Sequence, residues 1–173
     1  LGEHADVVVR FQGGANAGHT VQVGKDLYAF HLLPSGVLRR RTLNVIANGV
    51  VIEPAQLLRE IEEVRSRGHL DPNLRISDRA HVVMPYHKTI DGLEEGLKGN
   101  LASGSTRRGI APVFEDKVGK WGVRMCDLID PPALQEKLAA AVPVKQQIVR
   151  AFGGTEVLDR DALVKEYEEY GQR

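Results

Sequence analysis

An apolar run over residues 7–9 leads directly into a glycine-rich loop, and this junction constrains the fold more than any other part of the chain. The loop reads Gln-Gly-Gly-Ala-Asn-Ala-Gly-His-Thr from Gln12 to Thr20. Three consecutive valines predict a buried strand, and glycines after a strand allow backbone N–H groups to approach phosphate oxygens closely. The pattern is not a Walker loop, since no lysine precedes Thr20, and it is not GxGxxG. It predicts an anion-binding loop, with an ordinary glycine-rich turn as the alternative.

The composition limits the possible partners. With 173 residues the chain is long enough for one domain with a real core. The 23 basic and 23 acidic residues cancel, so bulk charge gives no reason to expect nucleic acid or a membrane. Cys126 is the only cysteine, which excludes an intrachain disulfide framework and favours a reducing, cytoplasmic setting. No apolar run approaches the roughly 20 residues of a membrane span.

The order of predicted elements indicates an α/β protein. Residues 1–85 alternate strands with helices, including a hairpin over 21–32 and a helix that begins at Pro54 and ends at Gly68. Residues 86–173 are mainly helical. We therefore expect an α/β core portion over 1–85, which contains the glycine-rich loop, and a helical subdomain over 86–173.

Two local patterns give further expectations. In the helix after Pro54, charged residues predict a solvated stripe opposite the apolar face, and they are Arg59, Glu60, Glu63 and Arg67. Near the carboxyl end, Asp130 followed by two prolines predicts a capped helix start, and Pro143 is expected to separate that helix from the next one.

Three segments carry most of the polar and glycine-rich character, and their motifs occur in a specific order. They comprise QGGANAGHT at 12–20, HLLPSG at 31–36 with NGVV at 48–51, and STRRGIAP at 105–112 followed by EDKVGKWGVR at 115–124. Taken together, these motifs resemble the adenylosuccinate synthetase family.

The resemblance implies a fragment of a P-loop-NTPase-like core sheet with a helical subdomain. It also implies a GTP-dependent, Mg²⁺-dependent ligase that joins IMP to L-aspartate through 6-phosphoryl-IMP and forms adenylosuccinate for AMP synthesis. Family members are homodimers in which one subunit contributes a residue to its partner's site. Phosphoryl transfer requires neutralised charge on the nucleotide oxygens, which metal ions, backbone N–H groups and positioned donors supply.

The resemblance assigns roles to the first loop. His19 matches the catalytic acid, which donates to a GTP phosphate oxygen. Gly18 matches the position whose carbonyl binds Mg²⁺, and Gly18, His19 and Thr20 match GTP contacts. Asn16, Ala17, Gly18 and His19 match the IMP site. From the residues alone, a lone histidine in a loop is more often solvated or structural.

Two further positions match the family less closely. Thr106 matches a contact to the IMP 5′-phosphate, with a helix N-cap or turn hydroxyl as the alternative. The family often has glycine where Arg107 stands. Lys120 occupies the place of an arginine that reaches the partner subunit's IMP, although lysine lacks the bidentate fork. A solvated surface lysine is the alternative.

The 173 residues contain no GDEGKGK-type loop, which in the family supplies the catalytic base and a phosphate-binding lysine. We therefore expect an internal fragment that is inactive by itself. A non-catalytic nucleotide-binding or dimerisation module on the same fold is the alternative function.

Overall fold

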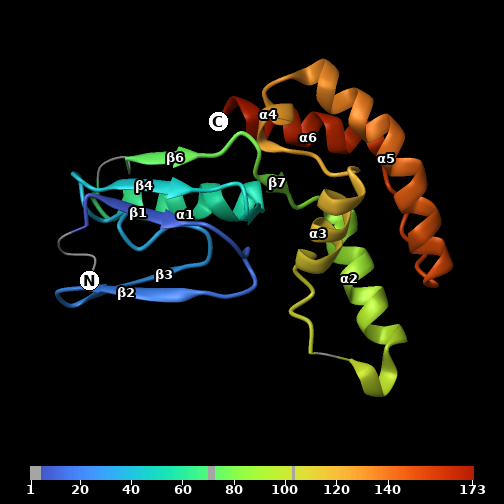
Figure 1. Ribbon diagram of the computed structural model, residues 1–173, viewed down its shortest axis with the longest axis horizontal. Coiled ribbons are helices and arrows are strands. Elements are labelled where there is room, and N and C mark those ends of the chain that lie inside the picture. The colour runs from blue at the N-terminus through green and yellow to red at the C-terminus, as the bar shows by residue number, and fades with distance from the viewer. Residues whose placement is uncertain (1–4, 70–72, 103) are drawn as a thin grey trace. The chain divides into compact units, whose positions relative to one another are not determined.

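The computed structural model describes residues 5–69, 73–102 and 104–173, which belong to two compact units. The first unit spans Leu1–Ala80 and holds most of the strands, whereas the second spans His81–Arg173 and is built mainly from helices (Figure 1). The predicted fold class, an α/β sheet with a helical part, is therefore confirmed.

A parallel sheet with strand order β1-β4-β6 forms the frame of the first unit. Its strands are β1 (Val7–Arg10), β4 (Leu43–Ile46) and β6 (Leu74–Ile76). In the register, Val45 lies between Val9 and Arg75. The other elements of this unit are β2 (His19–Val23), β3 (Asp26–Phe30), β5 (Val51–Ile52) and α1 (Pro54–Ser66). Parallel strands need long crossover connections, and here the β2–β3 hairpin and α1 provide them.

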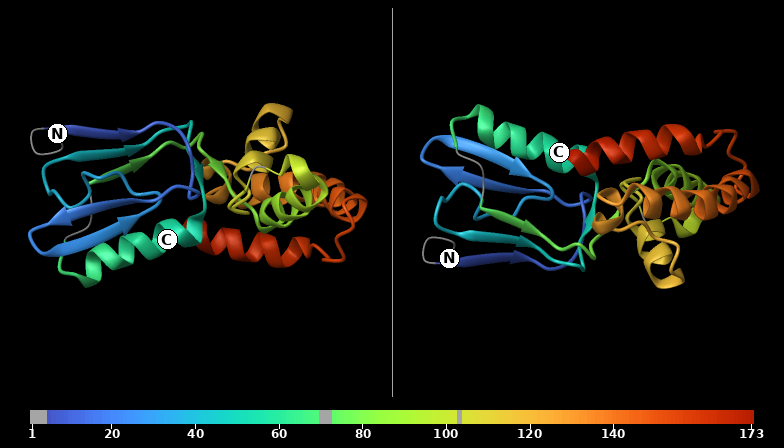
Figure 2. Two further views of the ribbon diagram at one scale, coloured as in Figure 1. Left: turned by 90° about the horizontal axis from the view of Figure 1, so that it is seen from below. Right: turned by 90° about the horizontal axis from the view of Figure 1, so that it is seen from above.

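The β2–β3 hairpin is tied to the end of α1 (Figure 2). The Arg67 guanidinium donates to the carbonyl of Leu27 at 2.7 Å and lies over the Tyr28 ring. The Tyr28 hydroxyl is hydrogen-bonded to His69 Nε2 at 2.8 Å. Helix α1 begins at Pro54 and is followed by Gly68 at φ 81°, as predicted.

The prediction of a fully buried first strand is wrong. Val7 is 50% exposed and Val9 is 49% exposed, because β1 lies at an edge of the described sheet and alternate side chains face opposite ways. Buried apolar residues gather instead around the ends of β3 and β4, and they include Phe30, Leu32, Leu33, Ile46, Val50 and Leu57.

The second unit surrounds its own apolar core. Its elements are β7 (His81–Val82), α2 (Pro85–Leu97), the 3₁₀ turn η2 (Gly99–Leu101), α3 (Ile110–Gly119), α4 (Met125–Leu128), α5 (Pro131–Ala151) and α6 (Arg160–Gln172). Helices α5 and α6 lie side by side (Figures 1 and 2). The core is formed by side chains such as Met84, Tyr86, Leu134, Leu138 and Val149.

Helix α5 runs through Pro143, so the predicted break there is wrong. Its start is as predicted, because the Asp130 carboxylate accepts from the Ala133 N–H at 3.3 Å. Pro143 is exposed, and so is Ala139, whose carbonyl the proline cannot engage. Leu138 and Val149 are buried in the core and hold both halves of the helix against it.

Candidate functional site

The loops that follow β1 and β4 meet at the carboxyl ends of these parallel strands, where α/β proteins commonly bind ligands. A cavity of about 460 Å³ opens there. It is lined by Val8, Val9, Arg10, Phe11, Gln12, Ala17, Gly18, His19, Pro34 and Ser35. The structure thus brings the QGGANAGHT and HLLPSG motifs to one cavity.

Backbone hydrogen bonds join the loop after β1 to the loop after β4. The Ala47 N–H donates to the Arg10 carbonyl at 2.9 Å, and the Val51 N–H donates to the Gly13 carbonyl at 2.8 Å. A Cβ on Gly49 would lie 2.1 Å from the Phe11 carbonyl oxygen, so only glycine fits there. The glycine of the NGVV motif therefore sets the closest approach between the loops.

Arg10 joins the two walls of the cavity. Its guanidinium donates to the carbonyl of His31 and, at 2.7 Å, to the carbonyl of Gly14. Burial lowers the pKa of Arg10 from its ordinary value, and the charge of Glu60 opposes that change. The guanidinium thus bridges the loop after β1 and the segment that follows β3.

His19 is the first residue of β2, and its ring is half-buried against the edge of Phe30 at 6.0 Å between centroids. Its Nε2 is buried and has no hydrogen-bond partner among the described residues. Burial, followed by the charges of Arg10 and His31, lowers the pKa of His19 below 6.5, while Glu60 opposes this change. The imidazole is therefore neutral at pH 7, with an unpaired ring nitrogen, and a nearby phosphate would raise its pKa again.

The other predicted residues of the first loop are exposed. They are Asn16, Ala17, Gly18 and Thr20. Gly18 packs on the neighbouring segment, because a Cβ there would lie 3.1 Å from His31 Nε2. A larger residue would push the loop and the His31 ring apart.

Glu60 was predicted to be solvated, and that prediction is wrong. Its carboxylate is 2% exposed and accepts backbone N–H bonds from His31 at 2.8 Å, Leu32 at 3.0 Å and Leu33 at 2.9 Å. The spacing carries a signal for this placement, since Glu60 lies three residues after Leu57 and four before Val64 on the buried face of α1.

The loop with the STRRGIAP motif is held by two carboxylates of α2. Asp91 accepts from the Gly109 N–H at 2.8 Å and from the Ser105 hydroxyl at 2.6 Å. Glu95 accepts from the backbone N–H groups of Gly104, at 2.5 Å, and Ser105, at 3.0 Å. Donors that could bind an anion are thus engaged by the protein's own acidic groups.

Thr106 and Lys120 lie in the second unit, and both are exposed. The residue at the N-cap of α3 is Gly109, so the alternative that Thr106 caps this helix is wrong. Arg107 has φ 55°, in the left-handed region that favours glycine. Lys120 has φ 63° and forms the C-cap of α3.

Sequence reasoning missed a buried polar network in the second unit. His87 Nδ1 accepts from the Met84 N–H at 2.9 Å, and His87 Nε2 pairs with Asp116 at 2.9 Å. The other Asp116 oxygen accepts from the Lys145 ammonium. Burial lowers the pKa of His87, and the bonds from His87 and Lys145 together lower the pKa of Asp116 against the opposing effect of burial.

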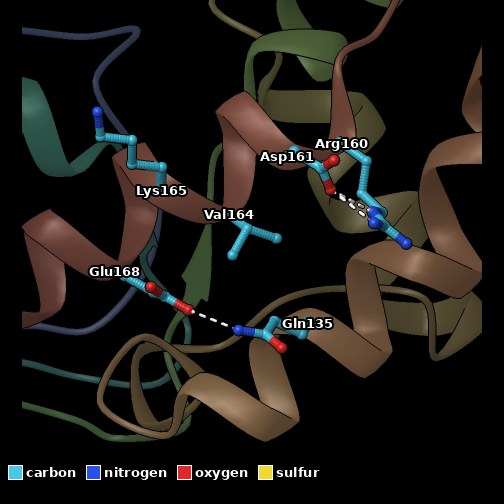
Figure 3. Close-up of a pocket in the computed structure, with 6 residues that line it drawn as sticks. All are labelled: Gln135, Arg160, Asp161, Val164, Lys165 and Glu168. Carbon is cyan, nitrogen blue, oxygen red and sulfur yellow. Dashed lines mark hydrogen bonds and ion pairs between the residues drawn. The ribbon is translucent and has the colours of Figure 1, made fainter.

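A second hollow, of about 310 Å³, lies between α5 and α6. Val164 lies between two polar pairs there, Gln135 with Glu168 at 3.1 Å and Arg160 with Asp161 at 2.6 Å (Figure 3). Lys165 completes the lining. None of its residues belongs to the motifs found in the sequence.

The described residues contain neither a metal-binding cluster nor a membrane-spanning helix. No group of three or more His, Cys, Asp or Glu side chains in that part of the chain could hold a metal ion. Within the same residues, no helix combines the length and the apolar character needed to cross a membrane.

Comparison with known proteins gives consistent results. The family model for adenylosuccinate synthetase matches residues 1–173. Adenylosuccinate synthetase from Clostridium botulinum is 49% identical over 100% of this chain and 41% of its own length. The protein of the same name from Carboxydothermus hydrogenoformans is 48% identical over 99% of this chain and 40% of its own length. The chain thus spans about two fifths of the length of these curated relatives.

Solved structures of similar proteins support the same family. A fully ligated adenylosuccinate synthetase from Plasmodium falciparum superposes with a TM-score of 0.82 at 32% identity, over 99% of this chain and 40% of that one. A cyanophage succinoaminodeoxyadenylate synthetase, bound to dGMP and dATP, superposes with a TM-score of 0.53 at 28% identity, over 68% of this chain and 31% of that one. The sequence motifs, the fold and these similarities together show that the chain belongs to the adenylosuccinate synthetase family.

Proposed function

We propose that the protein to which this segment belongs joins IMP to L-aspartate with GTP, and forms adenylosuccinate, GDP and phosphate. In the first step O6 of the base attacks the γ-phosphorus of GTP, which gives 6-phosphoryl-IMP and GDP. In the second step the aspartate amine attacks C6 and displaces phosphate. The proposal is supported most by the match of residues 1–173 to the family, together with the cavity that gathers its motifs.

In this proposal His19 is the acid of the first step. Its half-buried ring has an unpaired Nε2, and its lowered pKa keeps it neutral until phosphate charge arrives. A neutral imidazole with one N–H can donate to a phosphate oxygen as negative charge develops on the leaving GDP. The Thr20 N–H binds GTP phosphate, and Asn16 and Ala17 contact IMP.

In this proposal the backbone carbonyl of Gly18, an exposed residue, binds Mg²⁺. Mg²⁺ prefers oxygen ligands and is usually held by few protein groups plus substrate phosphates and water, so the lack of an acidic cluster among the described residues fits that mode. The bound ion would neutralise phosphate charge.

The second loop binds the IMP 5′-phosphate in this proposal, through the hydroxyl of Thr106. The backbone N–H groups of Gly104, Ser105 and Gly109 donate to α2 carboxylates. We therefore expect the phosphate to bind the Thr106 hydroxyl and the Arg107 guanidinium instead. Lys120 reaches the IMP of the partner subunit in a homodimer.

The test uses the purified protein that contains this segment, incubated with IMP, L-aspartate, GTP and Mg²⁺. We expect adenylosuccinate and one GDP per product, measured by chromatography and mass spectrometry. Omission of any one substrate is the control. Absence of adenylosuccinate from a folded protein would refute the proposed function.

The 173-residue chain by itself should form no adenylosuccinate. It contains no GDEGKGK-type loop, and loss of a proton acceptor alone typically costs about 10²–10⁴-fold in rate. Product formation by this chain, free of contaminating enzyme, would contradict that expectation.

A further inference from the structure

We propose that Glu60 is a positioning residue, which holds both walls of the cavity in place through His31 and Arg10. The carboxylate lies on α1, outside the cavity lining. Its charge opposes the lowering of the His19 pKa, and, apart from that effect, hydrogen bonds through His31 and Arg10 connect it to the glycine-rich loop.

The first step of the path is a carboxylate that accepts from three consecutive backbone N–H groups. His31, Leu32 and Leu33 donate to Glu60, and Gln56 Nε2 adds a fourth donor at 2.7 Å. A carboxylate accepts all of these, because both oxygens are acceptors. An amide of the same shape would turn its NH₂ group toward N–H donors and leave at least one of them unpaired.

The second step is the peptide backbone of His31. Its N–H is bound by Glu60 and its carbonyl by Arg10, so two opposite charges hold the same residue. Hydrogen bonds to ionised groups are stronger than neutral ones, particularly where water is excluded. Glu60 is 2% exposed, and Arg10 is half-buried.

The third step reaches the cavity. The same guanidinium binds the Gly14 carbonyl at 2.7 Å, inside the loop that supplies Gln12 and Ala17 to one wall. On the other side, Pro34 and Ser35 follow directly after the segment that Glu60 holds. One buried carboxylate thus fixes both walls relative to each other.

The test compares Glu60→Gln with Glu63→Gln, a matched change on the same helix. Glu63 is 35% exposed and forms an ion pair with Arg67 one turn away, at 2.7 Å. Backbone amide hydrogen exchange is measured first, because it does not depend on the proposed function. We expect faster exchange in Glu60→Gln both at 31–33 and at 13–18, and unchanged exchange in Glu63→Gln. Faster exchange confined to 31–33 would overturn the proposal, because the effect would not reach the cavity.

The second readout rests on the proposed function. At a temperature where every variant is folded, Glu60→Gln should lower kcat/KM for adenylosuccinate formation at least tenfold, because small misplacements of reacting groups cost large factors in rate. Glu63→Gln should stay within twofold of the wild type. A wild-type kcat/KM in Glu60→Gln would overturn the positioning role while the proposed function stands. If the wild type forms no product, the proposed function fails and the exchange pattern alone decides.

Arg10→Lys keeps the test decisive if Glu60→Gln does not fold. A single ammonium cannot reproduce the two-carbonyl fork, so exchange should rise at 13–18 while 31–33 stays protected by Glu60. If exchange in Arg10→Lys stays at the wild-type rate at 13–18 as well as at 31–33, the proposed path is wrong.

Discussion

The two glycine- and hydroxyl-rich loops are both held by carboxylates from a helix, but in different ways. In the first unit Glu60 binds the neighbouring segment 31–33, and the glycine-rich loop is fixed indirectly through Arg10. In the second unit Asp91 and Glu95 bind the N–H groups of the loop itself. The difference shows that similar sequence patterns can be held in two ways, by carboxylates that bind the loop's own N–H groups or by a carboxylate that binds a neighbouring segment.

The largest expected effect tests whether the first loop carries the chemistry. In the protein that contains this segment, His19→Asn should lower kcat by about 10²–10⁴-fold with a modest change in KM for GTP, because the donor acts mainly on charge that develops in the transition state. Steady-state kinetics measures both constants. The second loop provides the contrast, since Thr106→Ala should chiefly raise KM for IMP. The reverse pattern, with kcat lost in Thr106→Ala and retained in His19→Asn, would break the comparison.

The next prediction concerns the close approach of the strand-end loops. Gly49→Ala should destabilise the first unit by about 3 kcal/mol or more, because its Cβ would lie 2.1 Å from the Phe11 carbonyl oxygen, which is backbone and cannot turn aside. Urea denaturation followed by amide exchange of the first unit measures the loss. Gly96→Ala is the control, because nothing lies within 4 Å of a Cβ there. Alanine should stabilise α2 at that position by up to about 1 kcal/mol.

A third substitution tests how the second loop is held. Asp91→Asn should destabilise the second unit by about 1–3 kcal/mol, because an amide cannot accept from both the Gly109 N–H and the Ser105 hydroxyl. Exchange of the Gly109 amide should rise. The exposed Asp161→Asn should change stability by less than about 0.5 kcal/mol. Equal effects of the two substitutions would mean that Asp91 does not anchor the loop.

The smallest effect is a pH dependence of the second unit. Its buried His87 is neutral in the folded state, because burial lowers its pKa below 6.5 against the opposing effect of Asp116. Its Nδ1 accepts from the Met84 N–H, which fits the neutral ring. The unfolded chain binds more protons below pH 6.5, so stability is full above that pH and falls by up to about 1.4 kcal/mol per pH unit below it. The lowered pKa of Asp116 extends the loss to pH values below about 4.

Denaturation curves between pH 7.5 and 5, followed by fluorescence of the single tryptophan, Trp121, measure this slope. Trp121 belongs to the second unit, so the probe reports on the unit that contains His87. His87→Gln removes the titrating ring and should flatten the slope, whatever its effect on stability at pH 7.5. An unchanged slope in that variant would assign the pH dependence to another group.

The sequence alone determined features that depend on neighbouring residues. The helix starts at Pro54 and after Asp130 were predictable, because proline and cap residues act within one turn. The ordered motifs also identified the family. Local pattern placed the loop of His19 after a strand. The structure then shows that residues of the QGGANAGHT and HLLPSG motifs line one cavity, while the roles of the individual residues stay predictions.

Only the tertiary structure decided which partners the buried charges bind and which loops touch. Glu60 is separated from Leu33 by 27 residues, and His87 from Asp116 by 29, so no local pattern reveals their bonds. Packing against the core also carries α5 through Pro143. Arg107 has a positive φ where the family often has glycine, and its N–H donates to the Ser105 hydroxyl oxygen at 3.1 Å. The physical reason is the same in each case. Burial and close contact depend on residues distant in the chain, and their free energy outweighs the local preferences that a sequence displays.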